Sequence, residues 1–147
     1  AQVGVADGPT NAAYSGSNCY GTDLDAIVGT FQTPSLRSPP INLAGGTEAD
    51  LTGYHWRDME ERSGAGTSFQ CDTGAVNLLR ASDSSVIAAE VYLIEGTTTN
   101  GWEQTPPIDL PLAAMGQEII VEWVFTADDF QASKAGWYID NIEVIAP

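Results

Sequence analysis

Glycine and proline interrupt this chain so often that long helices have little room to form. Its 147 residues include 15 glycines and eight prolines, and the segments between them are mostly too short for an α-helix. Several segments instead alternate in hydrophobicity and carry many β-branched and aromatic residues, a pattern typical of half-buried strands. The sequence therefore predicts an all-β protein.

The clearest strand lies at 118–126, where the odd-numbered residues from Ile119 to Phe125 are apolar and share one face. Further strands are predicted at 50–57, 75–81, 86–95 and 137–145, with shorter ones near 17–23 and 35–43. A helical signal at 109–115 is too short and proline-rich for more than a turn or two. Many short strands without alternating helices favour one domain, an antiparallel two-sheet β-sandwich of jelly-roll type.

The charge balance excludes two classes of partner. Twenty carboxylates against five Lys or Arg give a formal net charge of −15, and the five cations are scattered singly along the chain. Nucleic acids and anionic lipid surfaces are bound by clustered cations. We therefore expect no nucleic-acid partner and no membrane insertion, since no apolar run approaches the length of a transmembrane helix either.

Scarce histidine and cysteine restrict the chemistry further. His55 is the only histidine, and Cys19 and Cys71 are the only cysteines, whereas zinc sites and nucleophilic triads depend on these residue types. His55 falls on a predicted strand and is expected in the core or at its rim. The two cysteines lack a C-x-x-C spacing and are predicted to form one disulfide, with two buried free thiols as the alternative.

Three stretches of the chain together resemble a known type of secreted domain. They are 14–24 followed by Leu36-x-Ser38-Pro39-x-Ile41-x-Leu43; Leu51-x-x-x-His55-Trp56-x-Asp58-x-Glu60 leading to Asp72-x-Gly74-x-Val76; and Gly136-Trp137-Tyr138-Ile139-Asp140-Asn141-Ile142. In this order and spacing they resemble the MAM-like jelly-roll domains of secreted bacterial proteins, including the immune-inhibitor-A and cleaved-adhesin type. The resemblance implies a non-catalytic, extracellular β-sandwich that often holds a structural calcium ion.

The chain departs from that family pattern at two places. The first strand of the pattern is missing or very short at the start of this sequence. Gly53 also stands where relatives tend to place an aromatic residue. These departures predict either an open sheet edge or a hollowed site.

Acidic residues near the ends of predicted strands are the candidate metal ligands. Asp58, Glu60 and Asp72 flank one glycine-rich loop, and Asp140 lies where the resemblance implies a calcium ligand. Calcium takes six to eight oxygen ligands, and one ion offsets the repulsion between clustered carboxylates. The alternative is a set of solvated loop acids, which is how we interpret the Asp128-Asp129 pair.

Aromatic residues suggest what such a domain binds. Tyr54 and Trp56 share strand parity, and Trp102 follows an Asn-Gly turn, so their rings are candidates for a platform that stacks on a sugar. Burial of these rings in the core is the alternative. Ile120 and Val124 lie on the face of their strand opposite the core, which indicates an overlying segment or a protein partner.

The leading functional hypothesis is a secreted, calcium-stabilised, non-catalytic accessory module that targets a polysaccharide or surface glycan. A MAM-like protein-protein or adhesion module is the alternative. A more distant one is an aspartic peptidase, because Asp72-Thr73-Gly74 matches the short signature of those enzymes. That signature lacks the apolar residues expected before the aspartate, since Phe69-Gln70-Cys71 precedes it.

Overall fold

The computed structural model describes residues 9, 13–22, 32–60, 72–98, 101–128 and 134–147. In chain order the elements of this part are β1 (Tyr20–Gly21), β2 (Ser35–Arg37), β3 (Ile41–Asn42), β4 (Asp50–Asp58), β5 (Thr73–Arg80), β6 (Val86–Ile94), β7 (Glu103–Gln104), β8 (Ile108–Asp109), the 3-10 turn η1 (Leu112–Ala114), β9 (Glu118–Thr126) and β10 (Gly136–Ile145). None of the described residues forms a helix long and apolar enough to cross a membrane.

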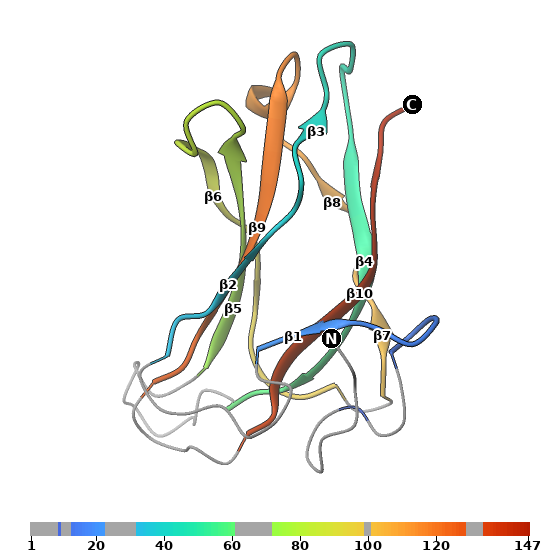
Figure 1. Ribbon diagram of the computed structural model, residues 1–147, viewed down its shortest axis with the longest axis vertical. Coiled ribbons are helices and arrows are strands. Elements are labelled where there is room, and N and C mark those ends of the chain that lie inside the picture. The colour runs from blue at the N-terminus through green and yellow to red at the C-terminus, as the bar shows by residue number, and fades with distance from the viewer. Residues whose placement is uncertain (1–8, 10–12, 23–31, 61–71, 99–100, 129–133) are drawn as a thin grey trace.

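The strands form two antiparallel sheets that pack face to face (Figure 1). The first sheet has the order β1-β10-β4-β7, with β8 also paired to β4, and the second has the order β2-β9-β5-β6, with β3 also paired to β9. The long strands β4, β5, β9 and β10 stand at the centre of the two sheets. The predicted all-β two-sheet sandwich is confirmed.

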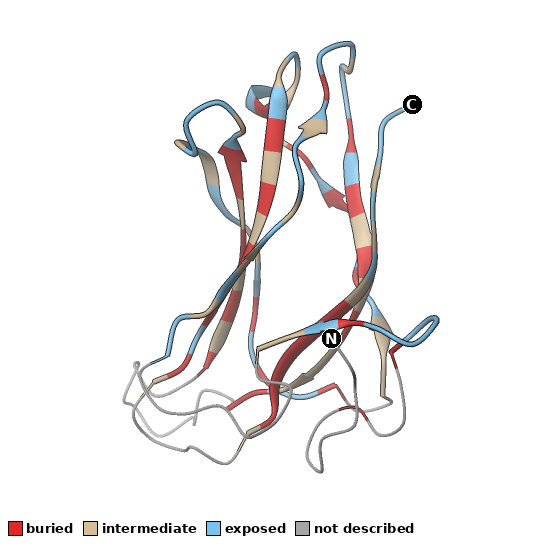
Figure 2. Cartoon of the chain, in the orientation of Figure 1, coloured by how far each residue is buried: buried red, intermediate tan, exposed pale blue. Residues whose placement is uncertain are grey.

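The core lies between the sheets and is built by alternation along the strands. On β9, Ile119 and Val121 are fully buried, whereas the residues between them face outward and are half-buried. On β4, Leu51 and His55 point into the core, and Figure 2 shows the alternating buried and exposed bands along both strands. A period of two therefore positions the interior, as the sequence predicted.

The strand boundaries match the sequence prediction closely, with two differences. The segment 35–43 is divided into β2 and β3, because Pro39 and Pro40 between them have no N–H to donate to a ladder. The two-residue strands β7 and β8 were not predicted, since two residues show no periodicity. The helical signal at 109–115 corresponds to the single turn η1.

A smaller buried cluster covers the outer face of the first sheet. Ala13, Cys19 and Tyr138 are buried in it, and Trp56 packs against it. The thiol of Cys19 is free, so the predicted disulfide to Cys71 is wrong for this structure, in which Cys71 lies outside the described residues. Burial raises the pKa of the Cys19 thiol to about 11, which keeps it protonated at neutral pH.

Candidate functional site

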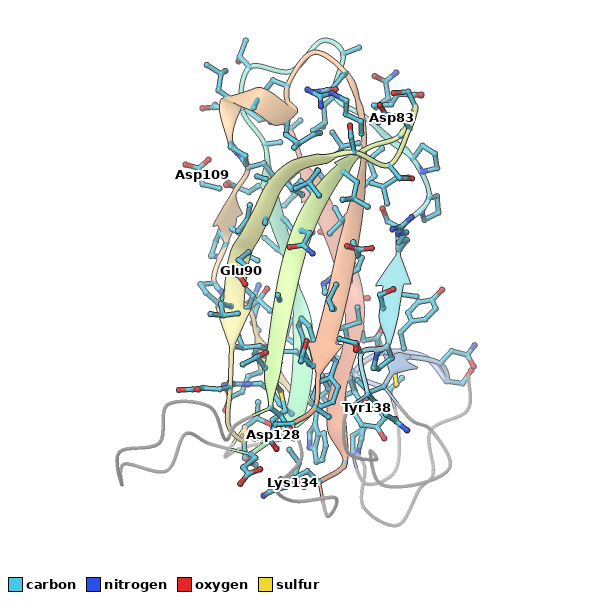
Figure 3. All side chains as sticks on the ribbon, turned by 90° about the vertical axis from the view of Figure 1, so that its left-hand side faces the viewer. Asp83, Glu90, Asp109, Asp128, Lys134 and Tyr138 are labelled. Carbon is cyan, nitrogen blue, oxygen red and sulfur yellow. The ribbon has the colours of Figure 1, made fainter. Side chains whose placement is uncertain are left out.

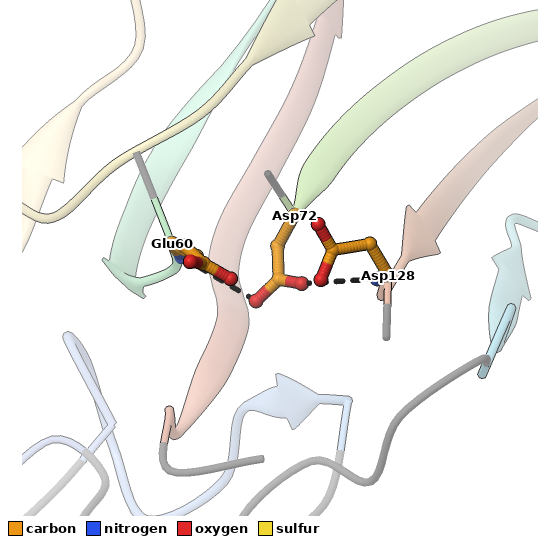
Figure 4. Close-up of side chains that lie close together, drawn as sticks. All are labelled: Glu60, Asp72 and Asp128. Carbon is orange, nitrogen blue, oxygen red and sulfur yellow. Dashed lines mark hydrogen bonds between the residues drawn. The ribbon is translucent and has the colours of Figure 1, made fainter. Parts of the chain in front are cut away.

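Three carboxylates from different segments meet at one end of the sandwich. Glu60 follows the end of β4, Asp72 immediately precedes β5, and Asp128 follows the end of β9. Each offers one oxygen, and these oxygens all lie within 4.8 Å of one another. We call these three residues the acidic cluster; Figure 4 shows their carboxylates facing one another.

The pairing register of the second sheet explains why Asp72 and Asp128 lie close together. Thr73 of β5 pairs with Thr126 of β9, so the residues just beyond this pair, Asp72 and Asp128, emerge at the same end of the ladder. Glu60 arrives from the first sheet, because β4 ends at that same end of the sandwich. The acidic cluster therefore lies where the two sheets meet.

Asp72 is the centre of the acidic cluster. Its Oδ2 accepts a hydrogen bond from the backbone N–H of Glu60 at 3.4 Å, and its Oδ1 accepts one from the backbone N–H of Asp128 at 3.3 Å. One carboxylate thus holds the backbones of both neighbours in place. The hydrogen bonds orient the Asp72 carboxylate between the two neighbouring segments.

Burial makes this concentration of charge costly. Asp72 is 3% exposed and Glu60 is 8% exposed, and the Oε2 atom of Glu60 is buried and has no hydrogen-bond partner among the described residues. Desolvation raises the pKa of Glu60, and repulsion by Asp128 and Asp72 raises it further. Desolvation also raises the pKa of Asp72, although its two backbone hydrogen bonds oppose that shift. An unpaired, buried carboxylate oxygen needs a cation or a proton.

The spacing of the oxygens suits a hard cation. Calcium binds oxygens at 2.3–2.6 Å, so two oxygens on opposite sides of one ion are about 5 Å apart. The oxygens of the acidic cluster already lie within that span. Three carboxylates supply three to six of the required ligand atoms, with carbonyls and water as the usual remainder.

The four sequence-predicted metal ligands fall into two groups. Glu60 and Asp72 are brought together in the acidic cluster, whereas Asp58 and Asp140 are not. Asp58 accepts hydrogen bonds from Lys134 Nζ at 3.0 Å and from Thr97 Oγ1 at 3.1 Å. Its carboxylate is therefore satisfied by a neighbouring cation and a hydroxyl.

Asp140 lies on β10 and is not part of the acidic cluster. Its Oδ2 accepts a hydrogen bond from the backbone N–H of Ser15 at 2.9 Å, and its Oδ1 accepts one from the N–H of Asn141 at 2.7 Å. These contacts tie the segment at 13–19 to β10. The geometry gives Asp140 a role in holding that segment.

The member of the acidic cluster that sequence reasoning missed is Asp128. It was interpreted as part of an ordinary charged loop, because its neighbour in sequence is also an aspartate. The signal that identifies it is the strand pairing Thr73 to Thr126, which places Asp128 beside Asp72 across the ladder. That pairing depends on the tertiary structure and does not follow from spacing along the sequence.

The three predicted sugar-stacking rings are all half-buried. Tyr14 stacks on Tyr54 with ring centroids 3.5 Å apart and planes 11° apart, and it contacts the edge of Trp102 at 6.5 Å. Trp56 packs edge-on against Tyr138 at 5.5 Å. One face of Tyr54 is therefore already covered by a ring of the protein itself.

Two other singled-out motifs have structural roles. His55 is 2% exposed and faces Tyr92 with ring centroids 6.3 Å apart, and burial lowers its pKa to about 4. In Asp72-Thr73-Gly74, the glycine is buried beneath Trp137, where an added Cβ would lie 2.7 Å from a ring carbon. Close packing accounts for this glycine without a peptidase turn.

Comparisons with known proteins do not place the chain in a family. No protein-family model matches the sequence, and no curated protein matches it. The resemblance to MAM-like domains stays a prediction.

Proposed function

We propose that this protein is a non-catalytic binding domain stabilised by a calcium ion held in the acidic cluster of Glu60, Asp72 and Asp128. The observation that carries the proposal is the buried Oε2 of Glu60, which has no hydrogen-bond partner in the described part of the chain and belongs to a carboxylate close to two others. A divalent cation would satisfy that oxygen and cancel most of the repulsion. Lys134 is the nearby cation, and its ammonium group is bonded to Asp58.

A non-catalytic role is supported by the burial of the same carboxylates. Exposures of 3% for Asp72 and 8% for Glu60 leave little surface for a substrate to reach. An aspartic peptidase needs its aspartates open to a peptide backbone. The cluster is better suited to holding a small ion than to hydrolysis.

A secreted location fits this site. Modules that work outside the cell bind calcium with dissociation constants of about 10⁻⁴ to 10⁻³ M, and a site with three carboxylates is compatible with that range. The charge of −15 also suits a domain that stays soluble in a calcium-containing medium. Glycan binding has less support, because the rings of Tyr54 and Trp56 are packed against aromatic neighbours and expose less surface on which a sugar could stack.

Calcium titration of chelator-treated protein tests the proposal. Calorimetry is expected to detect one ion per chain, and calcium at a hundredfold excess over the dissociation constant should add about 2.7 kcal/mol of stability, or about 5 to 10 °C in melting temperature. Magnesium should bind more weakly, because it demands a smaller, octahedral shell.

Matched variants locate the ion. Glu60→Gln and Asp128→Asn should each abolish most of the calcium-dependent rise in melting temperature. Asp109→Asn removes a carboxylate at the opposite end of the sandwich (Figure 3) and should leave the rise unchanged. No binding heat and no thermal shift in the wild-type protein would overturn the proposal.

A further inference from the structure

An apolar cleft runs along one edge of the sandwich, between the first strands of the two sheets. It has a volume of about 410 Å³, and Trp123 and Ile139 are among the residues that line it. Ile142 and Val144 of β10 line one side, and Leu36 lies on the opposite side. These side chains belong to the core or pack against it, so the cleft exposes interior surface of the protein. Its volume falls in the range of ordinary ligand pockets.

One wall of the cleft is a sheet edge with free pairing capacity. β10 pairs with β4 along most of its length, whereas β1 covers only Tyr138 and Ile139 on the other side. Among the described strands, none pairs with this outer side of β10 beyond Ile139. Figure 1 shows β1 crossing β10 and the rest of β10 continuing past it toward the C-terminus.

The opposite wall offers a shorter edge, because the edge strand β2 has only three residues. Pro39 and Pro40 interrupt the chain between β2 and β3 and line the cleft, and prolines cannot donate to a ladder. An extended segment that enters the cleft would therefore find backbone partners on β10. Strand addition of this kind is a common mode of peptide recognition.

Charge indicates which kind of segment fits. Glu143 is exposed on β10 within the free stretch, and Asp140 lies just before it. Arg37 is the charged residue that lines the cleft, and its guanidinium is already paired with Glu122 at 2.8 Å. The edge therefore presents negative charge to an incoming strand.

We propose that the cleft binds an extended, basic segment of a partner protein, which adds a strand to the outer edge of β10. Side chains of a strand alternate, so aliphatic residues of the segment enter the cleft beside Ile142 and Val144. The residues between them are Lys or Arg and lie beside Glu143. A second copy of this chain is a poor occupant, because it would bring Glu143 against Glu143 and a charge of −15 against −15.

This proposal names a partner class for the binding role and can fail separately from the calcium site. None of the three carboxylates of the acidic cluster lines the cleft. A protein that binds calcium without binding the peptide would refute only the strand addition. The reverse result would refute only the metal site.

Synthetic capped peptides test the proposal with the whole chain in calcium-containing buffer. In the probe peptide, isoleucine and lysine alternate. The first control has glutamate in place of each lysine, and the second has the same composition with the isoleucines contiguous. The third control has proline at the central position. Calorimetry measures affinity, and amide hydrogen exchange followed by NMR reports on β10. We expect the alternating peptide to bind at least about tenfold more tightly than each control. Amides of Ile142–Ile145 should gain protection on binding.

Variants of the protein distinguish binding in the cleft from non-specific electrostatic attraction. Val144→Ser and Glu143→Gln should each weaken peptide binding by about threefold to tenfold. Val86 is an exposed aliphatic residue on β6, at the far edge of the second sheet, so the control Val86→Ser should leave binding unchanged. Equal binding of the alternating and contiguous peptides would overturn the proposal. So would dimerisation of the free protein through β10, seen in sedimentation, or the absence of binding at millimolar peptide.

Discussion

Replacing Asp72 with asparagine should stabilise the protein when calcium is removed and destabilise it, relative to wild type, when calcium is present. The carboxylate of Asp72 is 3% exposed and lies within 4.8 Å of oxygens from Glu60 and Asp128. At an effective dielectric constant of about 20, two charges at that distance repel by about 3 kcal/mol. Asparagine removes two such repulsions.

The substitution also weakens hydrogen bonding. Asp72 accepts bonds from the backbone N–H groups of Glu60 and Asp128, and asparagine keeps one acceptor oxygen, so about 1 to 2 kcal/mol is lost. The pKa values of Glu60 and Asp72 are raised, chiefly by desolvation, so protonation relieves part of the repulsion as the pH falls. Two repulsions of about 3 kcal/mol each, less the lost hydrogen bonding, set an upper limit of about 4 to 5 kcal/mol. The expectation at pH 8 in chelator is therefore a net gain in stability.

The pH dependence has a definite sign. A carboxyl with a raised folded pKa binds more protons in the folded state, so Glu60 and Asp72 should contribute increasing stability to the metal-free wild type as the pH falls from 8 toward their unfolded pKa near 4. Asp72→Asn should reduce that gain. His55 contributes with the opposite sign in the lower part of that range. Urea denaturation at a series of pH values, with and without calcium, measures both effects.

The contradicting result is equally specific. If Asp72→Asn is less stable than wild type in chelator and still gains full stability from calcium, then Asp72 is a structural hydrogen-bond acceptor and the charge argument fails. Asp109→Asn, an exposed acid at the other end of the sandwich, serves as the control and should show neither effect.

Three further predictions concern Gly74, His55 and Tyr14. Gly74→Ala should cost about 1 to 3 kcal/mol in urea denaturation, because its Cβ would lie 2.7 Å from the ring of Trp137, whereas Gly45→Ala, with open space around it, should be neutral. Wild type should lose up to about 3 kcal/mol between pH 6.5 and pH 4 through His55, whose proton is taken up only by the unfolded chain; His55→Leu should flatten that part of the profile. Tyr14→Ala should lower stability by about 1 kcal/mol and Tyr14→Phe should not, and equal values for the two would contradict the stacking.

The sequence was informative about strands because burial imposes a period of two on side chains. The strand predicted at 118–126 is β9 with the same boundaries, and the predicted strand at 86–95 differs from β6 by one residue. The sequence could not predict which strands pair with one another, because register depends on contacts between segments far apart in sequence. The two-residue strands β7 and β8 depend entirely on their partner β4.

The same limit explains why the sequence predicted the members of the acidic cluster only in part. Proximity along the chain grouped Asp58 with Glu60, but Asp58 is paired with Lys134. The third acid of the cluster, Asp128, reaches Asp72 only through the ladder between β5 and β9. Sequence spacing pointed to the segment that holds Glu60 and Asp72, and the tertiary register brings Asp128 beside them.

The position of the acidic cluster explains why a cation would matter to the whole fold. The two sheets are held face to face mainly by side-chain packing, and at this end Glu60 comes from the first sheet while Asp72 and Asp128 come from the second. Repulsion among them pushes the sheets apart, whereas a shared ion pulls them together. Metal binding at this point therefore acts on the sheet-to-sheet interface, and its stabilisation should extend beyond the loops to the long strands β4 and β5.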